Sequence, residues 1–247
     1  MKGEEMMEHT VNGKAADFYT AQANRAAYAL VRLTAETLYA PCGPVYLYGD
    51  AGLGKTHLLQ AAEDFALKKY DDCVVQFFSA EDFVCRLNAA LVMNKIHTLE
   101  NRLLSSDLLL VDDIQALSGL DHAQKELSKI IRYVGETNTP VILTGNLPVR
   151  QMQGMDEDFI NLMEGGVAME VKPMDFPDRL NLLAQVAEKA GLAVGSEREV
   201  QDAILYITDI SGADIGAMKS ALHRVHMFAE ILDEALTVDF ARKVLAQ

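Results

Sequence analysis

The sequence is poor in cysteine and has no long apolar runs. Its three cysteines, Cys42, Cys73 and Cys85, are widely spaced and form no CxxC pair. An odd number of cysteines without metal-ligand spacing predicts reduced thiols that mostly pack in a core, in a reducing compartment. No apolar stretch reaches membrane-spanning length, and no basic segment followed by an apolar run opens the sequence. We therefore expect a cytoplasmic protein.

Basic residues are also scarce, which gives the chain a strongly acidic balance. It has 22 lysine and arginine residues against 36 aspartate and glutamate residues, and a formal net charge of −14. Proteins that bind an extended length of nucleic acid neutralise phosphates with lysine and arginine, so this balance argues against an extended DNA-binding surface. It argues equally against binding to an anionic membrane. The 247 residues are enough for one large domain or two small ones.

Strand-like and helix-like segments alternate from the start of the chain to Pro173. The strand-like segments are continuous apolar runs, which are typical of a sheet covered on both faces. We predict strands at residues 43–50, 73–79, 107–114, 140–146 and 167–173, and helices at residues 22–39, 55–70, 80–95, 97–104 and 121–135. This alternation predicts an α/β fold with a parallel sheet and right-handed crossovers.

Only helical patterns follow Pro173. Ser196 with Glu199 three residues later is typical of a capping box at the start of a helix. We predict helices at residues 178–191, 196–210, 212–232 and 237–245. We therefore place a domain boundary near residue 172, with an α/β domain over residues 1–172 and a small all-helical domain over residues 173–247.

A glycine-rich loop between a predicted strand and a predicted helix matches the pattern GxxxxGK[ST]. Its residues are Gly49, Asp50, Ala51, Gly52, Leu53, Gly54, Lys55 and Thr56. Such glycines let backbone N–H groups wrap a phosphate, and the positive end of the following helix points at it. Lys55 can reach the β- and γ-phosphates, and the Thr56 hydroxyl can ligate Mg²⁺. A chance glycine turn is the alternative, which the flanking strand and helix disfavour.

Polar side chains also end two later apolar runs. Asp112 and Asp113 close the run at residues 107–114, and Asn146 closes the next. Beside a phosphate loop, the first acid can hold Mg²⁺ through water, and the second can orient and activate an attacking water. The Asn146 amide can position that water or contact the γ-phosphate. The alternatives are two solvated acids at a strand end and an ordinary turn asparagine.

Several motifs match one family in the same order along the chain. "GLGKTHLLQA" at residues 52–61 includes His57, "DLLLVDDIQAL" follows at residues 107–117, and between them residues 79–107 have the length of an initiator-type helical pair. With these motifs the chain resembles the ATPase domain of the DnaA/Hda branch of AAA+ proteins over residues 18–245. The resemblance implies a Rossmann-like αβα sandwich (an AAA+ P-loop domain) followed by a helical lid.

The resemblance also implies ATP or ADP and Mg²⁺ as cofactors, held by the loop residues with His57. Phe18 and Tyr19 fall where the adenine pocket of the family begins, and core packing is the alternative for both. No other metal is expected, because His122, His223 and His226 have no further ligand at metal-binding spacing.

The departures from the family pattern concern its arginines and its DNA contacts. The segment of the arginine finger, residues 154–166, and the segment of the single-strand contacts, residues 118–124, contain no lysine or arginine. Gly216 stands at the position of the second sensor arginine. Whether Lys219 or Arg150 replaces a missing arginine stays open. The sequence ends before a helix-turn-helix domain, so sequence-specific duplex binding is not expected, and single-stranded DNA binding is not favoured.

These departures favour a nucleotide-binding regulator over a motor. An arginine from a neighbouring subunit can raise a phosphoryl-transfer rate by several orders of magnitude. We therefore expect weak or no hydrolysis, and regulation of chromosomal replication initiation through contact with DnaA or another AAA+ partner. The alternatives are an active ATPase that acts on single-stranded DNA or as a helicase loader, and a scaffold that uses nucleotide only for stability.

Overall fold

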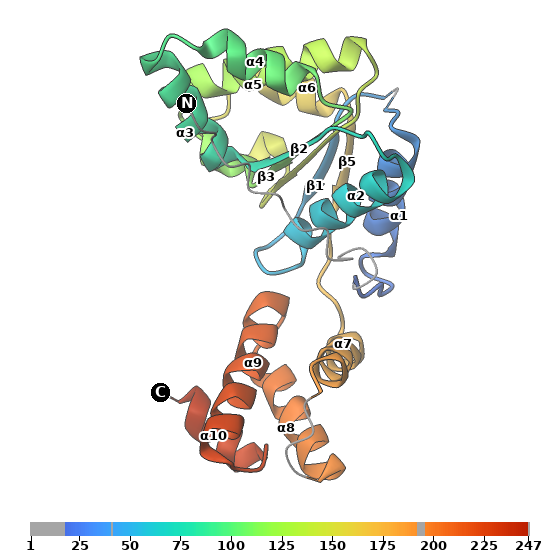
Figure 1. Cartoon of the computed structure of the whole chain (residues 1–247), viewed down its shortest axis with the longest axis vertical. Coiled ribbons are helices and arrows are strands. Elements are labelled where there is room, and N and C mark those ends of the chain that lie inside the picture. Colours follow the sequence, from blue (N-terminus) through green and yellow to red (C-terminus); the bar gives the residue numbers. More distant parts are fainter. Residues whose placement is uncertain (1–17, 41, 192–195, 247) are drawn as a thin grey trace.

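The computed structural model describes residues 18–40, 42–191 and 196–246. Figure 1 shows a layered α/β part, and below it a group of helices that forms the C-terminal region. Residues 1–17 of the predicted first domain lie outside the described residues. No described helix is long and apolar enough to span a bilayer.

A five-stranded parallel sheet lies at the centre of the α/β part, in the order β2-β3-β4-β1-β5. Its strands are β1 (Val45–Tyr48), β2 (Val75–Ser79), β3 (Leu108–Asp112), β4 (Val141–Gly145) and β5 (Val167–Glu170). Strands β3 and β4 are buried at every residue, whereas the edge strand β5 is partly exposed. The predicted parallel α/β fold is confirmed.

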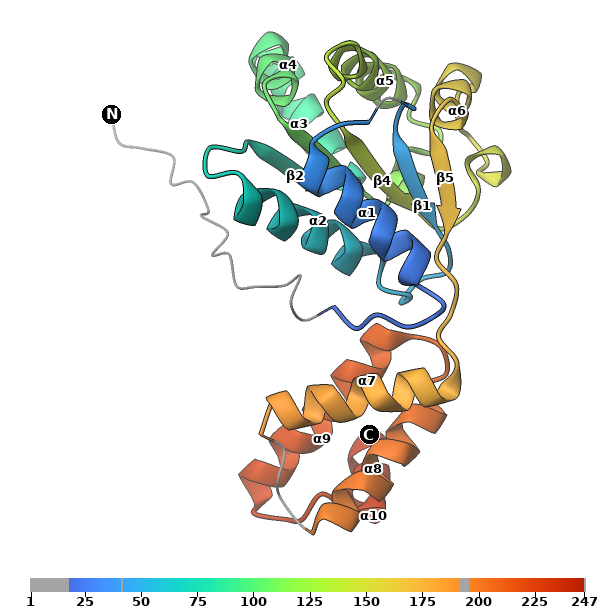
Figure 2. The same ribbon diagram turned by 90° about the vertical axis from the view of Figure 1, so that its right-hand side faces the viewer.

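Helices cover both faces of this sheet (Figure 2). Helices α1 (Arg25–Thr37) and α2 (Lys55–Lys69) cover one face, and α3 (Ala80–Val92), α4 (Ile96–Leu104), α5 (Asp121–Glu136) and α6 (Glu157–Glu164) cover the other. Within β3, Leu108 and Leu110 pack into the α1–α2 core, and Leu109 and Val111 into the opposite core. Side chains of a strand alternate between faces, so an uninterrupted apolar run fills both cores.

The predicted strand at residues 107–114 is two elements in the structure. Strand β3 ends at Asp112, and Asp113 has left-handed backbone angles (φ 56°, ψ 55°). The chain then forms a short 3₁₀ helix, η2 (Ile114–Leu117), and a second one, η3 (Val149–Gln151), follows β4. The two acids therefore differ in backbone conformation: Asp112 is extended at the end of β3, and Asp113 is in the left-handed turn.

The C-terminal region is helical and has its own apolar core. It consists of α7 (Phe176–Lys189), α8 (Glu197–Ile210), α9 (Ile215–Leu232) and α10 (Val238–Leu245). Leu183, Ile207, Leu222 and Phe240 come from these four helices and lie in one buried cluster. The predicted capping box is confirmed, because Ser196 and Glu199 each bond the backbone N–H of the other.

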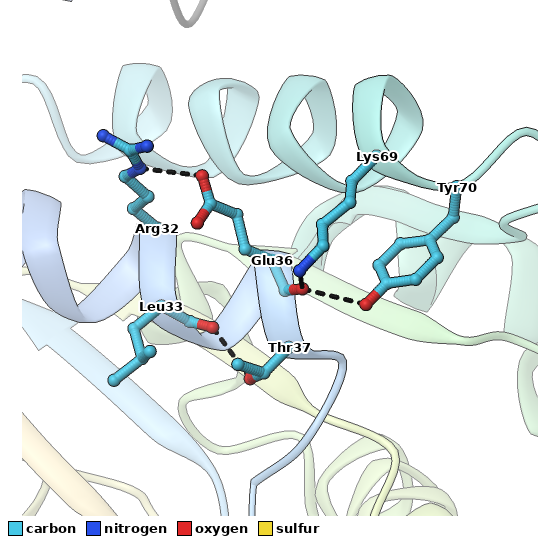
Figure 3. Close-up of polar contacts among 6 residues, drawn as sticks. All are labelled: Arg32, Leu33, Glu36, Thr37, Lys69 and Tyr70. Atoms are coloured by element: carbon cyan, nitrogen blue, oxygen red, sulfur yellow. Dashed lines mark hydrogen bonds and ion pairs between the residues drawn. The ribbon is translucent and has the colours of Figure 1, made fainter.

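The helix that follows the glycine loop is tied to α1 at its far end (Figure 3). Lys69 and Tyr70 both donate hydrogen bonds to the backbone carbonyl of Glu36, the second at 2.9 Å. The Glu36 side chain accepts a hydrogen bond from Arg32 Nε at 2.7 Å. Because α2 begins at the glycine loop, these contacts help to fix the helix that carries the loop.

The three cysteines are free, but the expectation that they mostly pack in the core is wrong. Cys42 and Cys85 are exposed, and only Cys73 is half-buried. In α3 the buried stripe is Phe83, Leu87 and Ala90, at helical spacing, and Cys85 lies off it. Composition alone cannot tell on which face of a helix a residue lies.

Candidate functional site

The glycine loop runs from β1 into α2 with an open helix N-terminus. Gly52 and Gly54 have φ angles of 78° and 91°, in the left-handed region that favours glycine. Gly54 is the N-cap of α2, where no side chain caps the helix. A Cβ on Gly49 would lie 2.5 Å from the carbonyl oxygen of Val171. The sequence therefore leaves the first N–H groups of α2 available to an anion.

Lys55 lies over this loop in a nearly buried position, with 7% of its surface exposed. Its ammonium donates hydrogen bonds to the carbonyl oxygens of Gly49 and Asp50, at 2.6 and 2.7 Å. Burial lowers the pKa of Lys55, and the charges of Asp113, Asp112 and Asp50 oppose that shift. The arrangement holds a cation beside the loop, where it can pair with phosphate oxygens.

Asp112 is fixed between the loop and the sheet. Its Oδ2 accepts a hydrogen bond from Thr56 Oγ1 at 2.7 Å, and its Oδ1 accepts one from Thr144 Oγ1. Thr144 Oγ1 also accepts the backbone N–H of Asp113 at 3.0 Å. Since the Thr56 hydroxyl uses its proton on Asp112, its lone pairs stay available. Thr56 and Asp112 are the hard oxygen donors that Mg²⁺ requires, and they fit this ion.

A cavity of about 480 Å³ brings most of the predicted site residues together. It is lined by Ala51, Gly52, Gly54, Lys55, Thr56, His57, Asp113, Gln115, Asn146, Ile215 and Gly216. We call it the phosphate cavity. Asp113 and Asn146, from the ends of two strands, thus lie beside the loop, as the sequence predicts. Gly49, Asp50, Leu53 and Asp112 do not line the cavity. Hydrogen bonds join Gly49 and Asp50 to Lys55, and Asp112 to Thr56.

A second cavity of about 310 Å³ shares Gly54, His57 and Ile215 with the phosphate cavity. We call it the aromatic cavity. Its other lining residues are Phe18, Tyr19, Leu53, Gln60, Met174, Leu182 and Lys219. This mostly apolar lining with two aromatic rings suits a flat ring system. Lys219 therefore lies in the aromatic cavity, and it is Gly216 that faces the phosphate cavity.

The C-terminal helices contact the glycine loop directly. The backbone N–H of Ile215, at the start of α9, donates to the carbonyl oxygen of Gly52 at 2.9 Å. Asp214 caps the same helix by accepting the N–H of Ala217, and a Cβ on Gly52 would lie 2.2 Å from its Oδ1. The loop and the lid helix thus meet at Gly52, where an added side chain would have to displace the Asp214 carboxylate.

Arg150 lies outside both cavities and has an acidic partner. Its guanidinium makes a two-pronged contact with Glu164, with N–O distances of 2.5 Å, and lies 3.8 Å from Glu157. Glu164 and Glu157 belong to α6, within the arginine-free segment. Arg150 is therefore held at the α6 edge of the sheet.

Two polar residues that hydrogen-bond to the acids of the site were not identified from the sequence. Thr144 belongs to β4, and the register Val111↔Leu143 places it beside Asp112. Gln115 lies two residues after Asp113 and donates to its Oδ1 at 2.9 Å. A threonine near a strand end and a glutamine after two acids can be recognised in the sequence. Their hydrogen-bond partners depend on the strand register and on the turn at Asp113, which the sequence does not show.

Comparison with known proteins places this chain in a family. The chain matches the model of the bacterial DnaA ATPase domain over residues 13–170. The chromosomal replication initiator protein DnaA of Jannaschia sp. (strain CCS1) is 28% identical over 230 residues, which are 93% of this chain and 48% of the relative. The chain thus spans about half the length of that relative.

Two solved structures share the fold. Domain III of the Thermotoga maritima replication initiation protein DnaA superposes with a TM-score of 0.86 at 19% identity, covering 94% of this chain and 95% of that one. A replication initiator DnaA bound to AMPPCP and single-stranded DNA gives 0.75 at 26% identity, covering 89% and 67%. Because the family model covers more than half of the chain, the protein belongs to the bacterial DnaA ATPase domain family, AAA+ proteins related to replication initiation.

Proposed function

We propose that this protein binds ATP or ADP with Mg²⁺, hydrolyses ATP slowly or not at all by itself, and regulates replication initiation through contact with DnaA or another AAA+ partner. The observation that carries the proposal is the composition of the phosphate cavity. Lys55, Thr56 and Asp113 surround it on one side, and Gly216 stands on the lid side, where a cation would contact a γ-phosphate.

The site residues have separate roles in this proposal. Residues 49–57 hold the nucleotide phosphates, and Thr56 and Asp112 hold Mg²⁺, which neutralises phosphate charge when bound. Asp113 orients and activates the attacking water, with Asn146 beside it. A DnaA relative of the same fold is bound to AMPPCP, which supports nucleotide binding by this chain. We also propose the division into an α/β nucleotide-binding domain at residues 1–172 and a helical lid at residues 173–247.

Slow hydrolysis follows from the charges around the cavity. A transition state for phosphoryl transfer spreads negative charge over the γ-phosphoryl oxygens, and arginines from a lid and a neighbour stabilise it. The described residues 154–166 contain no lysine or arginine, and Gly216 brings no charge to the cavity. Nucleotide binding needs only the loop, Lys55 and the metal ligands, so binding is retained while turnover is low.

The test is to measure ATP and ADP affinity and single-turnover hydrolysis of the purified chain, with and without the DnaA of the same organism. We expect Mg²⁺-dependent binding of both nucleotides, slow hydrolysis, and a changed rate of nucleotide turnover by DnaA. Lys55→Ala should abolish binding, whereas Lys68→Ala, an exposed lysine of the same helix, should not.

A gain-of-function variant tests the reason for slow hydrolysis. Gly216→Arg places a guanidinium at the phosphate cavity, and a Cβ there meets only Asp214 Oδ1, at 3.2 Å. We expect faster single-turnover hydrolysis than in the wild type. Gly135→Arg, at an open position of α5, is the control. Hydrolysis by the wild type as fast as by a DnaA with both arginines, or no effect on DnaA, contradicts the proposal.

The alternative is an active ATPase that acts on single-stranded DNA or as a helicase loader. Two observations favour it: the helical pair α3–α4 is present between β2 and β3, and one DnaA relative of this fold carries single-stranded DNA. Salt-sensitive binding of a labelled single-stranded oligonucleotide would support this alternative. Absence of binding at low salt would exclude it, because electrostatic binding is strongest there.

A further inference from the structure

Gln115 makes an incomplete set of hydrogen bonds beside the predicted water-activating acid. Its Nε2 donates to Asp113 Oδ1 at 2.9 Å. Its Oε1 is buried and has no hydrogen-bond partner among the described residues. The amide cannot be turned over, because that would place Oε1 against a carboxylate oxygen, and both are acceptors. Gln115 therefore holds Asp113 with one amide atom and carries an unused acceptor on the other.

Both side chains line the phosphate cavity, and their backbones are fixed. Asp113 adopts the left-handed conformation, and its N–H is bonded to Thr144 of β4. Gln115 follows in η2, whose own Ile114 and Leu117 side chains are buried. The distance between the Asp113 carboxylate and the Gln115 amide is thus set by the sheet and the 3₁₀ helix.

An attacking water needs two hydrogen-bond acceptors. Its oxygen must direct a lone pair at the γ-phosphorus, so both O–H bonds point away from the phosphate. One proton goes to the base, and the second must also be donated for the water to be held in one orientation. Lys55 has only donors. Gln115 Oε1 is an acceptor with unused capacity next to the base.

We propose that Gln115 positions the attacking water: Nε2 holds the Asp113 carboxylate, and Oε1 accepts the second water proton. This inference rests on the proposed function. The water oxygen forms a bond to the γ-phosphorus, the bond from that phosphorus to the bridging oxygen of ADP breaks, and Asp113 takes the proton. Because Oε1 is closed to solvent, the Gln115 amide must turn toward the cavity for Oε1 to reach this water, and the new hydrogen bond then pairs the acceptor.

The test compares two complexes of ADP and Mg²⁺, because it does not depend on turnover. Beryllium fluoride with ADP imitates bound ATP, whereas aluminium fluoride with ADP imitates the transition state and includes the attacking water. Gln115→Met keeps the length of the side chain and removes both hydrogen bonds. We expect the variant to bind ADP and the beryllium complex like the wild type, and to bind the aluminium complex about ten-fold more weakly.

Gln151→Met is the matched control, since Gln151 is exposed in η3 and lines neither cavity. It should bind both complexes like the wild type. If Gln115→Met and the wild type bind the aluminium complex equally, Gln115 does not position the water. The role of Gln115 is also overturned if the wild type binds ADP and the beryllium complex but not the aluminium complex. A wild type that binds no ADP would instead overturn the proposed function.

Discussion

At the scale of single residues, short polar side chains decide where the two acids at the end of β3 lie. Asp112 is 7% exposed and accepts hydrogen bonds from the hydroxyls of Thr56, after the loop, and Thr144, in β4. A buried carboxylate without such donors would carry the cost of unpaired buried oxygens. Thr56 and Thr144 therefore pair both carboxylate oxygens of Asp112.

Thr144→Val tests this arrangement, because valine has nearly the same shape and no hydroxyl. The change leaves Asp112 Oδ1 and the N–H of Asp113 without their partner, so we expect a loss of stability of about 1–3 kcal/mol in urea unfolding. ADP affinity should fall more in the presence of Mg²⁺ than in its absence. Thr144→Ser keeps the hydroxyl and should restore both. Unchanged Mg²⁺-dependent affinity in Thr144→Val would contradict the role of Thr144.

At the same scale, the local pattern predicted most residues of the candidate site. Residues 49–57 are contiguous, so their spacing carries the loop, and Asp113 and Asn146 lie at ends of apolar runs. Thr144 and Gln115 could not be assigned, because their partners depend on strand register and on the left-handed turn at Asp113. The same limit applies to Lys219, which lines the aromatic cavity rather than the phosphate cavity.

At the scale of elements, one nearly buried acid joins the helical pair α3–α4 to α5. Glu100 of α4 accepts a hydrogen bond from Lys129 of α5 and contacts His97 at 2.9 Å. The Lys129 hydrogen bond is the main cause that lowers the pKa of Glu100, and His97 adds to it. Because the pKa is lowered in the folded protein, this attachment stabilises the fold fully at pH values above the ordinary pKa of a glutamate. The stabilisation is lost as the pH falls through the lowered pKa.

Lys129→Met should loosen α4, because it leaves the Glu100 carboxylate with 12% side-chain exposure and without its main cation. We expect faster amide hydrogen exchange in residues 96–104 at neutral pH, with little change in the sheet. Lys125→Met, an exposed lysine one turn earlier in α5, should leave exchange unchanged. If α4 exchanges equally in both variants, its attachment depends on apolar packing alone.

At the scale of the whole molecule, the lid meets the glycine loop at Gly52. The backbone bond from Ile215 and the close approach of Asp214 place the start of α9 on the loop. Under the proposed function, nucleotide phosphates bind on the same loop, so the contact at Gly52 would couple lid position to nucleotide binding. Residues before α1 also contact the helical region: Ala21 belongs to its buried cluster, and Tyr19 donates a hydrogen bond to Asp178 at 3.4 Å.

Gly52→Ala should displace the lid, since its Cβ would lie 2.2 Å from Asp214 Oδ1. We expect a larger radius of gyration in X-ray scattering and faster proteolysis at residues 171–175. Gly212→Ala is the control for backbone strain alone: its φ is 59° and nothing lies within 4 Å of its Cβ. Gly52→Ala with Asp214→Ala should return the lid toward its wild-type position. No difference between Gly52→Ala and Gly212→Ala would exclude a steric effect.

The sequence alone determined the features that depend on residues close together in the chain. The tertiary structure decided the contacts between residues that are far apart in the chain. Apolar runs, the capping box at Ser196 and the glycine loop at residues 49–57 act through near neighbours, so local patterns were enough to predict the fold class and to locate the loop. The contacts Asp112–Thr144 and Gly52–Ile215 join distant segments. Only strand register and helix packing bring such residues together, because burial of apolar faces, and not any local motif, sets those positions.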